Sequence, residues 1–177
     1  FDELLQRRIK GEPVAYLIGS QGFWSLDLEV SPATLIPRPE TELLVEVALE
    51  LSLPEQASVL DLGTGTGAIA LALATERSHW QICAVDLHQQ AVDLAERNRQ
   101  RYQLENVSLF ASDWFAAIPA QRFDLILSNP PYIESSDPHL NNLKYEPIVA
   151  LVSGKDGLDD IRKIITQAPS FLNKNGY

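Results

Sequence analysis

The tetrapeptide Asn129-Pro130-Pro131-Tyr132 contains the residue types that point most directly to a reaction. The Asn129 side-chain oxygen and the Pro130 carbonyl can both accept hydrogen bonds from one NH2 group, and proline has no backbone N–H to compete as a donor. The Tyr132 ring can stack on a planar group. The tetrapeptide therefore predicts a site for a planar, nitrogen-bearing group. A stiffened strand exit without a ligand is the simpler alternative.

Two acceptors directed at one NH2 group also predict a reaction type. They fix the nitrogen and draw its lone pair out of conjugation, which makes the nitrogen a better nucleophile. No general base is needed before attack, since the nitrogen can lose a proton after it has gained a methyl group. The sequence shows no acid–base pair beside the tetrapeptide, and this agrees with N-methylation.

The glycine-rich segment Asp61–Gly67 (Asp-Leu-Gly-Thr-Gly-Thr-Gly) is a second candidate site. Its glycines, with Thr64 and Thr66 between them, allow a sharp turn and a close approach by a ligand, although a turn without a ligand remains the alternative. The spacing of Gly63, Gly65 and Ala68 also fits a dinucleotide, so it does not choose between cofactors. Asp61 favours S-adenosylmethionine, because a carboxylate repels a pyrophosphate and suits a cationic ammonium group.

Two further strand ends supply candidate cofactor residues. Asp86 ends the next expected strand, where a carboxylate accepts hydrogen bonds from ribose hydroxyls, and Leu87 follows it. A helix N-cap is the alternative role for Asp86, disfavoured because two residues separate it from the expected helix. At the end of the third strand, Asp113 is expected to accept from an adenine amine and Trp114 to pack on the ring. Core packing is the alternative for Trp114.

These candidates fall within a regular alternation of strands and helices that begins after Pro54. Strands are expected at residues 57–62, 80–85, 107–110 and 123–128, and helices at residues 67–75, 89–101 and 158–171. The alternation predicts an α/β fold with a doubly wound, mostly parallel sheet, in which ligands bind outside the carboxyl ends of the strands.

The first 54 residues follow a different pattern. We expect a helix over residues 1–10, a half-exposed strand of a hairpin over 22–30, a proline-rich loop over 32–39 and a helix from 39 to about 52. The expected division is residues 1–12 as the remnant of an N-terminal helical domain, 13–54 as hairpin and connecting segment, and 55–177 as a cofactor-binding catalytic domain. Because methionine is absent and a turn is expected at Gly176, we expect a fragment that lacks the sheet's last strands.

Composition limits the partner and the setting. The net charge is −10, from 14 basic and 24 acidic residues, and would on average repel phosphates, so a protein substrate is favoured over DNA or RNA. No stretch approaches the ~18 apolar residues of a membrane span. We do not expect Phe1–Leu5 to form a signal peptide, because they lack a basic region before an apolar run. The single cysteine, Cys83, excludes an internal disulfide and is interpreted as a buried thiol. We expect a cytoplasmic monomer without a structural metal.

Taken together, Asn-Pro-Pro-Tyr and the glycine-rich segment resemble the class I methyltransferases that act on exocyclic or amide nitrogens. The segments that narrow the resemblance are Leu35–Glu42, Ser112–Trp114, Ser128–Ile133 and Glu146-Pro147. With them, the chain from about Glu12 onward resembles the release factor glutamine methyltransferases (the PrmC/HemK family). Asn-Pro-Pro-Tyr alone is shared with DNA adenine methyltransferases, whereas Pro-Arg-Pro-Glu-Thr-Glu at residues 37–42 is far more specific.

The resemblance implies a Rossmann-like catalytic domain that transfers a methyl group from S-adenosyl-L-methionine and leaves S-adenosyl-L-homocysteine. The implied acceptor is the glutamine side-chain amide in the Gly-Gly-Gln loop of class I peptide-chain release factors. By the same resemblance, Gly63–Gly67 and Asp86 hold the cofactor, Trp114 borders the adenine, and Asn129–Tyr132 bind the glutamine amide. Arg38 and Glu42 belong to a segment that the resemblance places over the site.

Three other functions stay open at this point. A DNA or RNA adenine N6-methyltransferase would use the same tetrapeptide on a flipped base, but the negative charge and the lack of a basic recognition segment oppose it. A nicotinamide-dependent (NAD) oxidoreductase is opposed by Asp61 and by the lack of a Tyr–Lys or His proton donor near a strand end. A nucleotide-binding module without enzymatic activity is the third.

Overall fold

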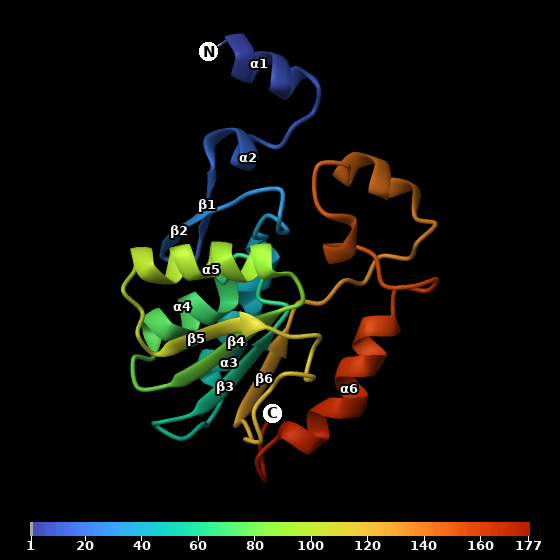
Figure 1. Cartoon of the computed structure of the whole chain (residues 1–177). Coiled ribbons are helices and arrows are strands. Elements are labelled where there is room, and N and C mark those ends of the chain that lie inside the picture. Colours follow the sequence, from blue (N-terminus) through green and yellow to red (C-terminus); the bar gives the residue numbers. More distant parts are fainter. Residues whose placement is uncertain (1) are drawn as a thin grey trace.

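A four-stranded parallel sheet forms the centre of the computed structural model, which describes residues 2–177 (Figure 1). Its strands are β3 (Ser58–Leu62), β4 (Gln81–Asp86), β5 (Val107–Ala111) and β6 (Leu125–Ser128). Their order in the sheet is β5-β4-β3-β6, so the direction of winding reverses between β3 and its neighbour β6. Ligands of doubly wound folds bind at this reversal, and the expected fold class is confirmed.

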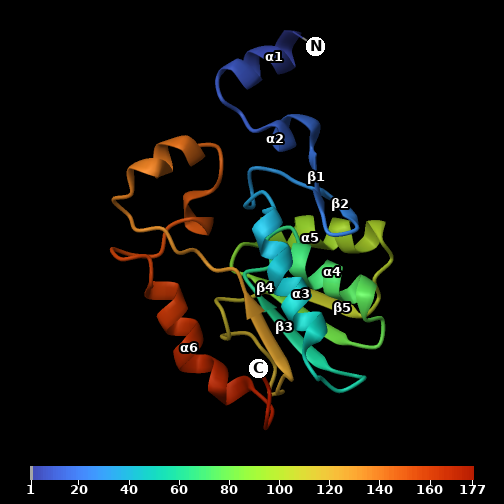
Figure 2. The ribbon, with the colours of Figure 1, turned by 180° about the vertical axis from the view of Figure 1, so that it is seen from behind.

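Helices cover both faces of the sheet (Figures 1 and 2). The helices are α3 (Glu42–Glu50), α4 (Ala68–Glu76), α5 (Gln89–Arg101) and α6 (Asp159–Phe171). On one face, side chains of α3 and α4 pack with Val59 and Ala84. On the other, α6 packs with Leu60 and Val85. Alternate residues of a strand point to opposite faces of the sheet, and here both faces are buried in an apolar cluster. The strands are therefore continuous apolar runs in the sequence.

The buried thiol expected at Cys83 is confirmed. The side chain lies on β4 in the cluster beneath α6, and burial raises its pKa to about 12. Such a thiol stays protonated and unreactive at neutral pH.

The N-terminal part holds two short helices and a hairpin. They are α1 (Asp2–Ile9), α2 (Val14–Ile18), β1 (Ser20–Phe23) and β2 (Leu26–Glu29), with β1 and β2 antiparallel. The expected single strand over residues 22–30 is wrong in its bounds, because a tight turn at Trp24, with φ of 55°, breaks it in two. The helix α2 was not expected. The start of the first predicted helix, Phe1, lies outside the described residues, and the division at residues 12 and 54 stays a prediction.

Several other boundaries differ from expectation. The helix expected over residues 39–52 is a 3-10 turn, η1 (Pro39–Thr41), followed by α3. The 3-10 turns η2 (Pro138–Leu143) and η3 (Ile148–Ala150) follow the tetrapeptide. The last residues of the chain form a turn and then return beside β6, where Ile126 N–H donates to the Tyr177 carbonyl at 2.9 Å.

Candidate functional site

The glycine-rich segment and the tetrapeptide start side by side at one edge of the sheet. Leu62, the last residue of β3, is the register partner of Ser128, the last residue of β6. The Ser128 hydroxyl donates to the Leu62 carbonyl at 2.8 Å. Two segments far apart in sequence therefore meet at the point where the winding reverses.

The glycine-rich turn is anchored to the end of β4. The backbone N–H groups of Gly63 and Thr64 both donate to the Val85 carbonyl at 2.9 Å, and Gly65 N–H donates to Asp86 Oδ2 at 3.0 Å. Gly67 has φ of 86°, and an added Cβ would lie 3.0 Å from Leu71. Glycine is required there because a side chain would be strained and crowded at once.

A cavity of about 250 Å³ lies over this turn, and we call it the first cavity. The predicted cofactor residues that line it are Gly63, Thr64, Gly65, Thr66, Asp86, Leu87, Asp113, Trp114 and Asn129. Gly67 and Asp61 do not line it. Leu87 is 58% exposed, which leaves an apolar side chain at the rim for a flat ligand ring.

Asp61 lies beneath the turn instead of in the cavity. It is fully buried, and burial raises its pKa to about 6, against the effect of the Thr64 hydroxyl that donates to Oδ2 at 2.7 Å. Its Oδ1 has no hydrogen-bond partner within residues 2–177. The structure therefore gives Asp61 a supporting position under the turn, and its expected attraction for a ligand ammonium group stays a prediction.

Trp114 forms a wall between the glycine turn and α6. An added Cβ on Gly63 would lie 3.5 Å from the Trp114 ring, so the indole lies against the turn. Its Nε1–H donates to Asp160 Oδ1 at 3.3 Å. The half-buried ring also packs against the core beneath α6. Trp114 therefore both lines the cavity and contributes to core packing. Asp113 beside it is exposed.

The tetrapeptide lines a second cavity of about 600 Å³. Asn129, Pro130, Pro131 and Tyr132 all contribute to it. Tyr132 is 65% exposed, so its ring is open to a partner. The residues that line both cavities are Leu35, Arg38, Thr41, Asn129, Pro131 and Ala150. The two cavities therefore meet at the tetrapeptide.

The Asn129 side chain is oriented by Thr41. Its Nδ2 donates to Thr41 Oγ1 at 3.2 Å. Within residues 2–177, neither Asn129 Oδ1 nor the Pro130 carbonyl oxygen accepts a hydrogen bond. One free acceptor, on Asn129, therefore lies where the cavities meet, and the other, on Pro130, belongs to the lining of the second cavity. That both bind an NH2 group stays a prediction.

Arg38 is held over the site by a buried carboxylate. Glu146 accepts from Arg38 Nη2 at 2.6 Å and from the Ile36 N–H at 3.0 Å, and its side chain is 4% exposed. This contact fastens the segment before α3 to the loop after the tetrapeptide. Glu42, in contrast, lines neither cavity and accepts from the Trp24 N–H at 2.8 Å, which supports the hairpin turn.

Other lining residues escaped the sequence analysis. Thr34 lines the first cavity with a buried hydroxyl that has no partner within residues 2–177. Asp160 and Lys163 reach the same cavity from α6. Thr41 lies within the motif at residues 37–42, but no feature of the nearby sequence indicates its contact with Asn129. The other three carry no local signal, because tertiary packing alone brings them to the cavity.

The described residues contain neither a metal-ligand cluster nor a membrane-spanning helix. In residues 2–177, no group of three or more His, Cys, Asp or Glu side chains is placed to hold a metal ion. No helix in this part of the chain has the length and apolar character needed to cross a membrane.

Comparison with known proteins supports the fold and the motifs. A family model described as "Methyltransferase small domain" matches residues 39–145. The "Release factor glutamine methyltransferase" of Pseudomonas aeruginosa is 61% identical over 179 residues, which cover 100% of this chain and 65% of that protein. The protein of the same name from Escherichia coli K12 is 54% identical, over 99% of this chain and 64% of its own length. The chain thus spans slightly less than two thirds of these relatives, and the resemblance found in the sequence is confirmed.

Among solved structures, a methyltransferase from Pyrococcus furiosus superimposes with a TM-score of 0.62 at 22% identity. The match covers 99% of this chain and 76% of that one and shows the shared fold. The names of the curated relatives do not favour the adenine methyltransferase or the oxidoreductase.

Proposed function

The chain belongs to the methyltransferase small domain family, and on that premise we propose that it methylates a glutamine side-chain amide. The methyl donor is S-adenosyl-L-methionine and the product is S-adenosyl-L-homocysteine. The acceptor is the glutamine of the Gly-Gly-Gln loop in class I peptide-chain release factors. The names of the relatives at 54–61% identity support this choice of substrate.

One observation carries the proposal: two neighbouring acceptors are free in the second cavity, and one of them, on Asn129, lies where that cavity meets the first. Asn129 Oδ1 and the Pro130 carbonyl are unpaired within residues 2–177, while Thr41 fixes the other end of the Asn129 amide. Both cavities include Asn129 in their walls. A primary amide in the second cavity can therefore give both its hydrogens to the protein while its nitrogen faces the first cavity.

The residues of the first cavity fit S-adenosylmethionine. The orphaned Thr34 hydroxyl would gain a polar partner, which offsets a cost of about 1–3 kcal/mol for a buried group without one. Asp86 has one hydrogen bond at each oxygen, from Gly65 and His88, and retains lone pairs for ribose hydroxyls. Leu87 and Trp114 offer apolar surface to an adenine. When bound, this cofactor supplies an electrophilic methyl group attached to a sulfonium.

The chain's own residues would activate the amide nitrogen. An amide nitrogen is a poor nucleophile because its lone pair is delocalised into the carbonyl. The acceptors at Asn129 and Pro130 hold both N–H bonds, and this contact strengthens as the nitrogen gains positive charge. The surplus proton then passes from the nitrogen to water, and Tyr132 can hold the plane of the amide by stacking.

Transfer of a labelled methyl group tests this function. Purified release factor should take up label, and a release factor with the loop glutamine replaced by alanine should not. Duplex DNA and RNA serve as competing substrates in parallel reactions. Label in nucleic acid, with none in the release factor, would replace the glutamine assignment with the adenine one.

We also propose that the protein acts as a monomer in the cytoplasm, where translation termination takes place. Sedimentation at micromolar concentration should give a single species near 19.7 kDa. A species of twice that mass would contradict the proposed monomer and leave the glutamine assignment intact.

A further inference from the structure

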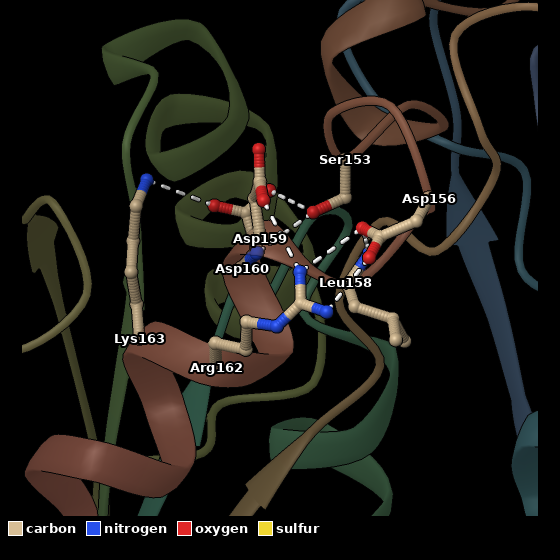
Figure 3. A network of polar contacts seen from close by, with 7 residues as sticks. All are labelled: Ser153, Asp156, Leu158, Asp159, Asp160, Arg162 and Lys163. Carbon is tan, nitrogen blue, oxygen red and sulfur yellow. Dashed lines mark hydrogen bonds and ion pairs between the residues drawn. The ribbon is translucent and has the colours of Figure 1, made fainter.

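A polar cluster at the start of α6 centres on Asp160 (Figure 3). Its carboxylate lines the first cavity and accepts three hydrogen bonds. The donors are Trp114 Nε1 at 3.3 Å, Ser153 Oγ at 2.8 Å and Lys163 Nζ at 3.2 Å. The Asp160 side chain is only 18% exposed. It therefore joins α6, the loop before it and the wall of the cavity at one point.

The Ser153 side of the cluster leads to the tetrapeptide. Ser153 is buried, and its hydroxyl also accepts from the Asp160 N–H at 2.7 Å. Its backbone N–H donates to the carbonyl of Ile133, the residue after Tyr132, at 3.0 Å. An added Cβ on Gly157 would collide with the Tyr132 carbonyl oxygen, so the loop lies directly against the tetrapeptide.

The Trp114 side of the cluster needs a restraint. Trp114 has φ of 49°, a left-handed conformation that costs a bulky residue of order 1–3 kcal/mol and persists only where its surroundings hold it. The contact with Asp160 is the hydrogen bond that the structure gives the indole N–H. Apolar packing beneath α6 limits where the ring can go, and the Asp160 carboxylate accepts from its N–H.

Asp160 keeps its charge in this setting. Burial alone would raise the pKa of its carboxyl, but donation from Ser153, Lys163 and Trp114 outweighs burial and holds the pKa below the usual value. Hydrogen bonds to an ionised carboxylate are stronger than neutral ones, so the charge strengthens the restraint on the indole.

We propose that Asp160 is a positioning residue. Through the Trp114 indole it fixes the wall of the first cavity, and through Ser153 it couples that wall to the tetrapeptide. The role of the wall in holding a cofactor rests on the function proposed above, whereas the contact between Asp160 and the indole does not.

The indole contact is testable without any ligand, by nitrogen–proton correlation NMR. The three tryptophans give three indole N–H signals, and Trp114→Phe identifies the one that belongs to Trp114. Asp160→Ala should shift that proton signal upfield, because the donor loses a charged acceptor. Asp160→Asn should restore part of the shift, since its amide oxygen can still accept.

The matched control is Asp159→Ala, which removes a carboxylate from the same first turn of α6 whose side-chain partner is Arg162 and not the indole. A Trp114 signal that stays in place in Asp160→Ala, or moves as far in Asp159→Ala, would overturn the proposal. If Asp160→Ala does not fold, Asp160→Asn bears the comparison: a shift larger than that of Asp159→Asn supports the contact, and an equal shift overturns it.

Cofactor binding then tests what the positioning achieves. S-adenosylhomocysteine should bind Asp160→Ala up to about tenfold more weakly than wild type, because the ligand must then order an indole that the carboxylate no longer fixes, at a cost of about 0.5–1.5 kcal/mol. In a Trp114→Phe background, which lacks the indole N–H, the same change should add almost nothing. A tenfold loss in both backgrounds would show that Asp160 does not act through Trp114. If the wild type shows the indole contact and binds no S-adenosylhomocysteine, the cofactor assignment fails while the contact stands.

Discussion

Where the two cavities meet, the two ends of the Asn129 side-chain amide have different tasks. Asn129 gives its amino group to Thr41 and keeps its oxygen free, so its orientation is decided before any substrate arrives. Preorganised acceptors of this kind cost no reorganisation at the moment of reaction. The sequence reveals Asn129 because the tetrapeptide is a recognisable motif. It does not reveal Thr41, because the two residues lie 88 positions apart and only the fold brings them together.

Asn129 should control the rate more than cofactor affinity. Asn129→Ala should lower kcat by roughly 10²–10³, typical of losing one electrostatic contact to the transition state. Asn129→Asp keeps an acceptor and should retain some activity. Steady-state methyl transfer with cofactor titrations checks both variants, and near-native turnover in the two alike would reduce Asn129 to a shaping role at the strand exit.

Asp61 should make stability depend on pH. Its folded-state pKa of about 6 exceeds the usual 3.8, so the folded protein holds this proton more tightly than the unfolded chain. The contribution of Asp61 to stability is therefore greatest below pH 3.8, declines as the pH rises to 6, and is constant above that. Asp61→Asn should remove this decline and gain up to about 3 kcal/mol on wild type at pH 7.

Urea denaturation at several pH values between 3.5 and 7.5, chosen to span that interval, measures the effect. Glu46→Gln, at an exposed position on α3, is the control and should track wild type. If Asp61→Asn declines in parallel with wild type between pH 4 and 6, the buried carboxyl is not the source of the dependence.

At the level of elements, the parallel strands were predictable, whereas the segments that enclose the site were not. Strands buried on both faces stand out as apolar runs, and glycines and carboxylates mark their ends. The hairpin turn at Trp24 carries no such mark, since its left-handed backbone is imposed by its surroundings, including Glu42. The 3-10 turns after the tetrapeptide have no periodicity that would distinguish them from loop. One of the contacts that hold this loop is an ion pair between a buried carboxylate and a half-buried guanidinium.

That ion pair, between Arg38 and Glu146, should hold in place the segment before α3, which contributes Arg38 to the lining of both cavities. Glu146→Gln keeps the shape but removes the charge, and should destabilise the protein by about 1–3 kcal/mol and lower kcat/KM for the release factor. Glu29→Gln is the matched control, because its partner Arg97 is half exposed and such pairs contribute about 0–1 kcal/mol. Thermal unfolding and methyl-transfer rates should be measured on both variants. Equal losses of stability and activity in the two would show that the Arg38–Glu146 pair contributes no more than an exposed pair.

For the whole molecule, the N-terminal helix α1 stands apart from the sheet and the helices that cover it (Figure 1). No residue of α1 is buried, while Ala15 and Tyr16 of α2 belong to a small core cluster with Val30 and Ile36. The Tyr16 hydroxyl donates to the Thr34 carbonyl at 2.7 Å, so α2 reaches the lining of the first cavity. The two short helices therefore differ in what they support.

Removal of residues 1–11 should leave cofactor affinity unchanged and shift Tm by less than about 3 °C, the equivalent of roughly 1 kcal/mol in a chain of this size. Removal of residues 1–19 also takes away Ala15 and Tyr16 and should lower both Tm and affinity. Calorimetry on the two truncated proteins compares them directly. A loss of affinity after removal of residues 1–11 alone would mean that α1 contributes to the site.

The wall shared by the two cavities has a consequence for linkage between their occupants. Six residues, Asn129 among them, line both spaces, so whatever fills one alters the surface met by the other. Thermodynamics makes such coupling reciprocal: the factor by which the methyl donor changes the affinity for a glutamine peptide must equal the factor by which the peptide changes the affinity for the donor. The residues that line both cavities are therefore also the part of the protein through which each ligand would change the affinity for the other.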